Sequence, residues 1–378
     1  MEPKSLFILI AGCVVPSLLI ALLATPLIRR LAVPLRLVDL PGERKVHTQP
    51  TPRGGGIAIW LAVVSVFAAI SLLVVLQAQS PSLDALIPSF ARPHLAGIQT
   101  QLPKLWILLG AGTLLMLLGL ADDRGGVRWQ WRLLVEFVVA GCCVWLIPNL
   151  RLTAFLPFPL FTGLLSVLWI VTLINAFNML DNMDGLSAGV AVIAASMLAA
   201  VMLLAPNPES EGPQLFVAGL LLVLVGGLVG FLWHNRPPAR IFMGDSGAYF
   251  IGFTIAAATL LASYTGYKGP TRHAILAPLC MMAVPLYDLI TVVCIRLASG
   301  KSPFEADKNH FSHRLVELGL TKTQAVLTVY LTTVTCGLAA LLLHRTDTLG
   351  ALFILLLIGS ILAIIAILET TARRALRR

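Results

Sequence analysis

The sequence predicts an all-α polytopic membrane protein with about eleven transmembrane helices, and three observations support this. The chain of 378 residues is 58% hydrophobic and only 12% charged, a balance that soluble proteins of this length rarely show. Its apolar residues gather in runs close to the roughly 20 residues that a membrane-spanning helix needs. Lysine and arginine are concentrated in alternate connecting segments, as the positive-inside rule expects. We therefore expect residues 1–378 to form a single integral membrane domain.

The expected spans follow one another with short polar connections. The first ends without a small-residue cleavage site, so it is interpreted as a retained span and not as a signal peptide. The fourth is short, and the fifth and sixth flank a dense polar stretch. The eighth has a carboxylate between two glycines near its start. In chain order the spans are 6–24, 54–76, 105–121, 133–148, 160–178, 186–205, 215–233, 241–263, 272–296, 323–343 and 348–369.

The distribution of positive charge predicts the orientation. Eleven spans place the two termini on opposite sides of the membrane. With the C-terminal tail inside, 20 of the 27 Lys and Arg residues are also inside. We therefore expect the N-terminus outside and the C-terminus in the cytoplasm. The seven cations that remain outside are Lys4, Arg92, Lys104, Arg151, Lys268, Arg272 and Arg345.

A dense polar stretch, residues 175–185, lies between two apolar runs on the predicted inner side. Carboxylates at a membrane boundary are costly unless they pair, bind a metal or face water, so they indicate function. Asn178 and Asp181 are three residues apart and would project from one side of a helix end. Gly185 would allow the backbone to leave the helix there.

Two further acidic stretches fall on the same side. Asp122 and Asp123 end one apolar run, and adjacent carboxylates need a cation, a metal or a shared proton. A solvated helix end is the alternative for this pair. Asp245 lies between two glycines at the start of another run, where a helix N-cap is the alternative. Carboxylate and amide oxygens suit Mg²⁺, which takes one or two protein carboxylates together with phosphate and water.

Cationic and histidine residues occupy the remaining inner segments. His310 and His313 have a spacing that could ligate zinc, but their cationic neighbours Lys308 and Arg314 favour phosphate binding. The first inner loop combines basic residues with three glycines at 54–56, which could cradle phosphate on backbone N–H groups or touch anionic lipid headgroups.

Two other features are interpreted conservatively. Asp288 and Arg296 lie eight residues apart in one span, and an intramembrane ion pair is the simplest interpretation. The six cysteines all lie in apolar runs without metal-ligand spacing, so we interpret them as small hydrophobic residues.

The chemistry that these residues fit is metal-assisted phosphoryl transfer between a nucleotide and a lipid phosphate. Both reactants are anions, so a divalent ion and basic side chains must offset their repulsion. The sequence contains no serine nucleophile motif, Walker loop or dinucleotide fingerprint.

Four motifs in this order resemble those of the polyprenyl-phosphate N-acetylhexosamine-1-phosphate transferases. They are Asp-Asp-Arg at 122–124, Asn-x-x-Asn-x-x-Asp-x-x-Asp-Gly at 175–185, Phe-Met-Gly-Asp-Ser-Gly at 242–247 and Ala-Asp-Lys-x-His-x-x-His-Arg-Leu at 306–315. The resemblance implies transfer of a sugar 1-phosphate, preferentially GlcNAc 1-phosphate, from a UDP-N-acetylhexosamine to undecaprenyl phosphate, with release of UMP. It also implies Mg²⁺, with Mn²⁺ as an alternative.

The same resemblance implies roles and a location. The location is the bacterial inner membrane, and one active site would be built from cytoplasmic loops. The protein would contact membrane lipid and have no nucleic-acid partner, and a homodimer is possible. Metal ligands would be Asp245 and Asn178, and catalytic residues Asp122, Asp123, Asp181, Asp184, His310 and His313. Substrate-binding residues would be Lys45, His47, Arg53, Asn175, Gly185 and Arg314.

Three departures from the family pattern bear on these roles. The lysine that usually follows the Asp-Asp pair is absent, and Arg128 or Arg132 is the expected substitute. Ser312 replaces one histidine, and Ala248 replaces a serine. Three consecutive histidines are also absent, which favours the hexosamine branch over phospho-N-acetylmuramoyl-pentapeptide transferases. A transporter and a catalytically silent scaffold are the competing classes; the clustering of acids at one face argues against a transporter.

Overall fold

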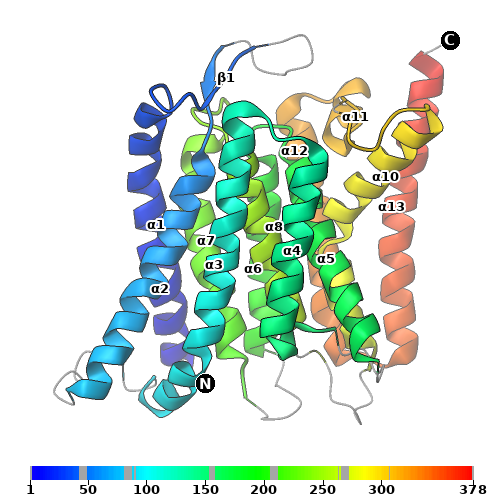
Figure 1. Cartoon of the computed structure of the whole chain (residues 1–378). Helices are drawn as coiled ribbons and strands as arrows, with labels where there is room; N and C mark the ends of the chain where they lie inside the picture. Colours follow the sequence, from blue (N-terminus) through cyan, green and yellow to red (C-terminus); the bar gives the residue numbers. More distant parts are fainter. Residues whose placement is uncertain are drawn as a thin grey trace.

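The computed structural model describes residues 2–41, 49–80, 87–88, 91–152, 158–204, 212–262, 264, 272–305 and 307–376. Within these residues the chain is almost entirely helical (Figure 1). The long helices are α1 (Pro3–Leu31), α2 (Gly55–Gln79), α3 (Leu95–Gly125), α4 (Trp129–Leu146), α5 (Pro159–Leu180), α6 (Leu186–Leu204), α7 (Leu215–Asn235), α8 (Gly244–Leu261), α10 (Ala283–Ala298), α12 (Lys322–Leu342) and α13 (Thr348–Leu376).

Shorter elements connect these helices. They are α9 (Ala277–Met281), α11 (Phe311–Glu317), the 3₁₀ turns Arg92–His94, Pro148–Leu150, Arg272–Leu276 and Leu343–Arg345, and the strands β1 (Val38–Asp39) and β2 (Thr51–Pro52). The two strands pair antiparallel, with Val38 opposite Pro52 and Asp39 opposite Thr51.

The described helices confirm a polytopic membrane protein. Nine of them are long and apolar enough to cross a membrane: α1 to α7, α12 and α13. A bent pair, His273–Met281 with α10, would make a tenth span across its 66° break. Large apolar side chains on the outer faces of α1 and α13 are more than half exposed, including Leu23, Leu27, Phe353 and Ile367. Such a surface suits a bilayer and would be costly in water. The count of eleven spans and the orientation stay predictions.

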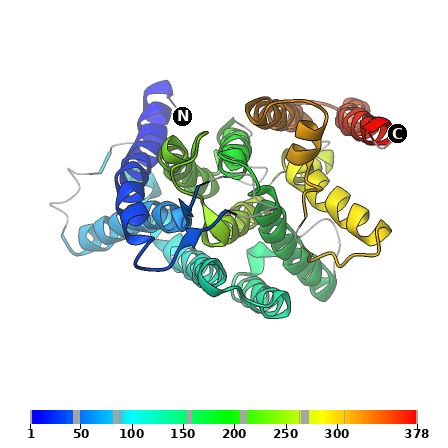
Figure 2. The same cartoon turned by 90° about the horizontal axis from the view of Figure 1, so that it is seen from above.

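Helix α8 is not among the nine apolar helices, because Gly244, Asp245, Ser246 and Gly247 fill its first turn. It nevertheless lies at the centre of the bundle (Figure 1), where α2, α3 and α5 pack around it. Seen from above, α13 stands at the edge of the layer (Figure 2). The polar start of α8 is therefore enclosed by its neighbours.

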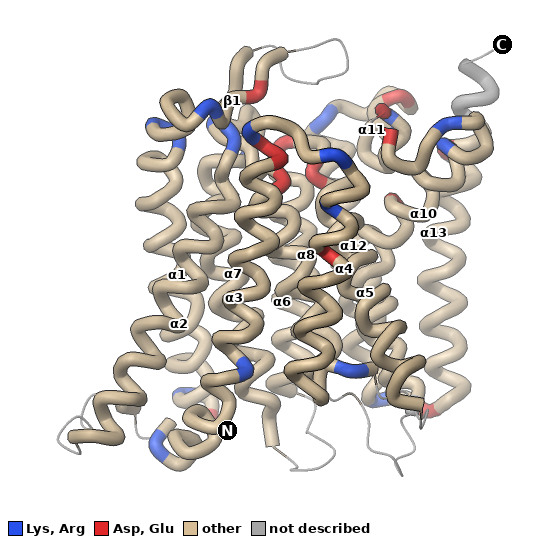
Figure 3. Tube along the Cα trace, viewed as in Figure 1, with Lys and Arg blue, Asp and Glu red and all other residues tan. Residues whose placement is uncertain are grey.

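Acidic residues gather at one end of the helix layer, the end that carries β1 (Figure 3). The connections from α3 to α4, from α5 to α6 and from α10 to α11 lie at this end, whereas the two termini lie at opposite ends (Figure 1). The predicted gathering of the polar loops at one face is therefore confirmed.

Candidate active site

The centre of the acidic cluster is the first turn of α8, which Asp123 at the end of α3 holds in place. The Asp123 carboxylate accepts the backbone N–H groups of Asp245 at 3.0 Å and Ser246 at 3.1 Å. The first N–H groups of a helix have no partner within it, and a carboxylate there is also favoured by the helix dipole. A side chain at Gly244, where φ is +75°, would place its Cβ 2.5 Å from the Asp123 carboxylate. Glycine is therefore required at this position.

Asp245 is more accessible to solvent than the two acids at the end of α3. Its side chain is 32% exposed, against 7% for Asp122 and 1% for Asp123. One oxygen accepts the Asn178 amide at 2.6 Å, which brings together the two residues expected to bind metal. The other lies 4.0 Å from the Arg132 guanidinium. The N-cap residue of α8 is Met243, and Asp245 lies in the first turn of the helix, so the simple N-cap alternative is wrong.

Asp122 is fixed by three donors. It accepts hydrogen bonds from Arg132 at 2.6 Å, from the backbone of Val127 at 2.7 Å and from the Tyr249 hydroxyl at 3.3 Å. Arg132 thus stands between Asp122 and Asp245. Arg128 is exposed at the start of α4. Of the two arginines expected to substitute for the missing lysine, the structure places Arg132 at the site.

Arg53 brings a second cation to the cluster from the loop before α2. It donates to Asp39 at 2.5 Å and lies 3.9 Å from Asp123. Burial lowers the pKa of Arg53, but the charge of Asp39 and its hydrogen bond outweigh this and raise the pKa above its ordinary value. Arg53 therefore stays charged. Lys45 and His47, also expected to contact substrate, lie outside the described residues.

Asp181 follows the last residue of α5 and lies close to the other acids. Burial raises its pKa to about 7, and the nearby charge of Asp123 adds to this. The Gly244 backbone and Arg53 act in the opposite direction but do not outweigh burial. Asp181 is therefore an acid that can hold a proton near neutral pH.

The end of this loop is tied to the protein through its backbone. Asp184 accepts the Ala239 N–H at 3.0 Å. Gly185 has φ of +74°, as expected for a residue that lets the chain leave a helix. Its N–H donates to Asn235 at 3.0 Å, and its carbonyl accepts the Tyr330 hydroxyl at 2.5 Å. Because both backbone groups of Gly185 are engaged, the structure assigns it an anchoring position.

The segment 309–314 lies beside this loop. The Ser312 hydroxyl donates to the Asn182 amide oxygen at 2.5 Å, so the residue that departs from the family pattern joins the two motifs. The rings of His310 and His313 are 6.2 Å apart. Burial lowers the pKa of His313 to about 4, with a further contribution from His310. His313 is thus neutral near pH 7 and offers a hydrogen bond, not a charge.

Arg314 is almost fully buried. Its guanidinium donates to Glu369 on α13 at 2.8 Å, to the Asn309 carbonyl at 2.5 Å and to the Thr291 hydroxyl at 3.0 Å. A contact between Arg314 and a substrate would have to replace one of these bonds. Its predicted role in substrate binding stays a prediction.

The interpretation of Asp288 and Arg296 as an ion pair is wrong. Asp288 lies 2.9 Å from Nδ1 of His310 and accepts the backbone N–H of Phe311 at 2.5 Å. Arg296 instead forms two bonds of 3.1 Å with Asp307, which hold the pKa of Asp307 at about 2 although burial raises it. Helical spacing correctly placed both groups on one face but could not identify partners from a loop.

Three residues were not expected at the site. Glu136 on α4 is 1% exposed and accepts the Asn175 amide at 2.5 Å. As a lone acid within an apolar run, it carried the signal of an intramembrane functional group. Tyr249 and Asn235 carried no such signal, because single polar residues near helix ends are common.

The chain is similar to known proteins over most of its length. The family model described as glycosyl transferase family 4 matches residues 105–263. A probable undecaprenyl-phosphate N-acetylglucosaminyl 1-phosphate transferase of Bacillus subtilis is 32% identical over 93% of this chain and 89% of its own length. A decaprenyl-phosphate N-acetylglucosaminephosphotransferase of Mycolicibacterium smegmatis is 34% identical over 83% of this chain and 77% of its own. An undecaprenyl-phosphate alpha-N-acetylglucosaminyl 1-phosphate transferase of Yersinia pestis is 28% identical over 85% of this chain and 79% of its own length.

Proposed function

The chain belongs to glycosyl transferase family 4, and from this premise we propose that it transfers GlcNAc 1-phosphate from UDP-GlcNAc to undecaprenyl phosphate. An oxygen of the acceptor phosphate attacks the β-phosphorus of UDP-GlcNAc. The bond between this phosphorus and the bridging oxygen breaks, and UMP leaves. Direct attack is sufficient, because holding two reactants in line supplies much of the acceleration.

The observation that carries this proposal is the meeting of Asp122, Asp181 and Asp245 with two arginines at one end of the helix layer. Arg132 lies 2.6 Å from Asp122, and Arg53 lies 3.9 Å from Asp123. A site for two phosphate-bearing substrates needs cations to offset their charge. Arg53 and Arg132, which are 29% and 23% exposed, can reach such phosphates.

Asp245 and Asn178 would hold Mg²⁺ or Mn²⁺, which would draw charge from the transferring phosphoryl group. No cluster of three or more His, Cys, Asp or Glu side chains in the described part of the chain is arranged to hold a metal. The residues present nevertheless fit magnesium, which is commonly held by one or two carboxylates together with substrate phosphates and water. Asp245 suits this mode because its side chain is more exposed than those of Asp122 and Asp123.

The remaining residues are proposed to shape and charge the site. Asp123 fixes the start of α8, and Asp122 orients Arg132 toward Asp245. Asp181 and Asp184 line the nucleotide side. The histidines of segment 309–314, held against Asn182 through Ser312, contact the diphosphate or the sugar.

The environment is proposed to be the bacterial inner membrane. Apolar helices and bacterial relatives support a multi-pass membrane protein, and the charge distribution favours a cytoplasmic site. The polyprenyl acceptor would reach the site from the lipid. Dimerisation stays a prediction.

Release of UMP tests the proposal. Purified full-length protein in lipid nanodiscs should release UMP from UDP-GlcNAc only when undecaprenyl phosphate and Mg²⁺ are both present. Asp245→Asn should abolish this release. Glu305→Gln, at an exposed carboxylate paired with Lys301, is the matched control and should keep wild-type turnover. Wild-type turnover by Asp245→Asn would contradict the metal site, and no release with a panel of UDP-N-acetyl sugars would favour a scaffold.

A further inference from the structure

We infer that Asp288 is a positioning residue that fixes the proton of His310 on the Nδ1 nitrogen and aims the opposite ring nitrogen, Nε2, away from the carboxylate. Asp288 lies on α10 and His310 directly precedes α11. The part of this inference that concerns turnover rests on the proposed transferase function.

Asp288 is completely buried, and each of its oxygens has one partner. One oxygen faces Nδ1 of His310 at 2.9 Å, and the other accepts the backbone N–H of Phe311 at 2.5 Å. The two donors are adjacent in the chain, so the carboxylate holds both the ring and the backbone from which the ring projects. An acceptor-only carboxylate at this distance requires the proton on Nδ1.

The other charged group on this face of α10 is not available to Asp288. Arg296 is occupied by Asp307 through two bonds and by the Pro303 carbonyl. In an Asp–Arg pair the buried carboxylate would only stabilise the fold. Instead, the carboxylate of Asp288 contacts the ring of His310.

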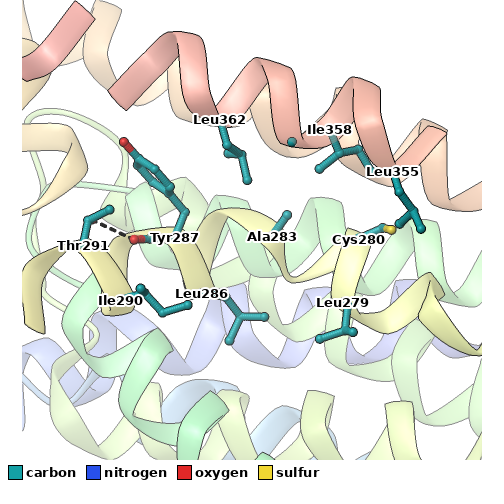
Figure 4. Close-up of a pocket in the computed structure, with 11 residues that line it drawn as sticks. Leu279, Cys280, Ala283, Leu286, Tyr287, Ile290, Thr291, Leu355, Ile358 and Leu362 are labelled. Carbon is teal, nitrogen blue, oxygen red and sulfur yellow. Dashed lines mark hydrogen bonds between the residues drawn. The ribbon is translucent and has the colours of Figure 1, made fainter. Parts of the chain in front are cut away.

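The opposite side of α10 has a different environment. There, α9, α10 and α13 line an open apolar pocket of 350 Å³ whose lining includes Leu286, Ile290 and Leu362 (Figure 4). Asp288 is not among the lining residues, because it lies on the other side of the helix. The carboxylate is therefore directed toward α11 and the polar loops, and not toward lipid.

The held histidine lies near the acidic cluster. Ser312, two residues after His310, bonds Asn182, and Asn182 is the neighbour of Asp181. Within the part of the chain that the structure describes, the bond to Asp288 is the one hydrogen bond of the His310 ring. Its Nε2 nitrogen is left to contact a ligand phosphate or sugar hydroxyl.

Replacing Asp288 with asparagine makes a specific change. The amide oxygen of the Asp288→Asn variant can still accept the Phe311 N–H, but its amide nitrogen would donate to His310. Nδ1 would then have to be the acceptor, and the proton would move to Nε2. Asp288→Glu keeps the carboxylate and therefore keeps the proton on Nδ1.

The experiment reads the ring nitrogens directly. Solid-state NMR of ¹⁵N-histidine-labelled full-length protein in lipid nanodiscs should show a protonated Nδ1 for His310, assigned by loss of its signals in His310→Gln. In Asp288→Asn the proton should be on Nε2, and in Asp288→Glu it should stay on Nδ1. The signals of His273, which bonds the Leu343 and Thr346 carbonyls, should not change. An unchanged His310 spectrum in Asp288→Asn would overturn the inference.

Turnover supplies the second readout. Asp288→Asn should lower kcat by about 10- to 100-fold in the otherwise wild-type protein. In a His310→Gln background the same substitution should lower kcat much less, because the ring that Asp288 holds is already absent. Equal losses in the two backgrounds would mean that Asp288 does not act through His310. If wild-type protein gives no UMP at all, the proposed function fails while the NMR result still decides the position of the proton.

Discussion

Replacement of Arg132 should lower transfer far more than replacement of its neighbour Arg128. Arg132 donates to Asp122 at 2.6 Å and lies 4.0 Å from Asp245. Removing a preorganised donor from a phosphoryl or acyl transfer site typically costs about 10²- to 10³-fold in kcat, or roughly 3–4 kcal/mol of barrier. We therefore expect Arg132→Met to lose about that much kcat/KM.

The cost to stability should be much smaller. A hydrogen bond to a charged group contributes about 1.5–3 kcal/mol, but Arg132 is 23% exposed and screening reduces its contribution. Asp122 also keeps its bonds from Val127 and Tyr249. The expected loss is about 1–2 kcal/mol, so the variant should remain folded.

The assay compares initial rates of UMP release for wild type, Arg132→Met, Arg132→Lys and Arg128→Met, each checked by thermal unfolding. Arg132→Lys keeps the charge but not the planar fork of donors, so an intermediate rate is expected. Arg128→Met should stay within about twofold of wild type, as exposed substitutions usually do. A rate for folded Arg132→Met within about threefold of wild type would refute the reasoning, as would an equal loss in Arg128→Met.

Three further outcomes follow from the same geometry. Gly244→Ala should lower both the melting temperature and turnover, because its Cβ would meet Asp123; Gly125→Ala, with open space around it, should change neither. Asp181 has its pKa raised to about 7, so the folded chain retains a proton that the unfolded chain releases near pH ~4. Stability should therefore fall as pH rises from about 4 to 7, and Asp181→Asn should flatten that fall in melting temperature. Chelation by EDTA should stop UMP release and added Mg²⁺ restore it, whereas Asp245→Asn should not respond to Mg²⁺; activity in EDTA would contradict a metal requirement.

Much of the helical layer could be predicted from the sequence, because a bilayer demands long apolar runs. Helix α8 was expected as the span 241–263, but it lies at the limit of that reasoning. Its first turn is too polar for a simple hydropathy criterion, yet the surrounding helices bury it. The number of membrane crossings therefore cannot be read from composition alone.

The acidic motifs could be predicted as one site, but their partners could not. Asp123 meets Asp245 across 122 positions in the chain, and no local pattern encodes such a contact. Arg132 could be distinguished from Arg128 only after the turn between α3 and α4 was known. The burial of Arg314 against Glu369 likewise depends on where the last helix packs.

The most direct test of the account is binding of Mn²⁺ followed by electron paramagnetic resonance in nanodiscs that contain UDP-GlcNAc. Wild-type protein and Glu305→Gln should each bind one ion, and Asp245→Asn should bind none in the same concentration range. Equal binding by Asp245→Asn would show that the metal is held elsewhere and would contradict a reaction centred on the first turn of α8.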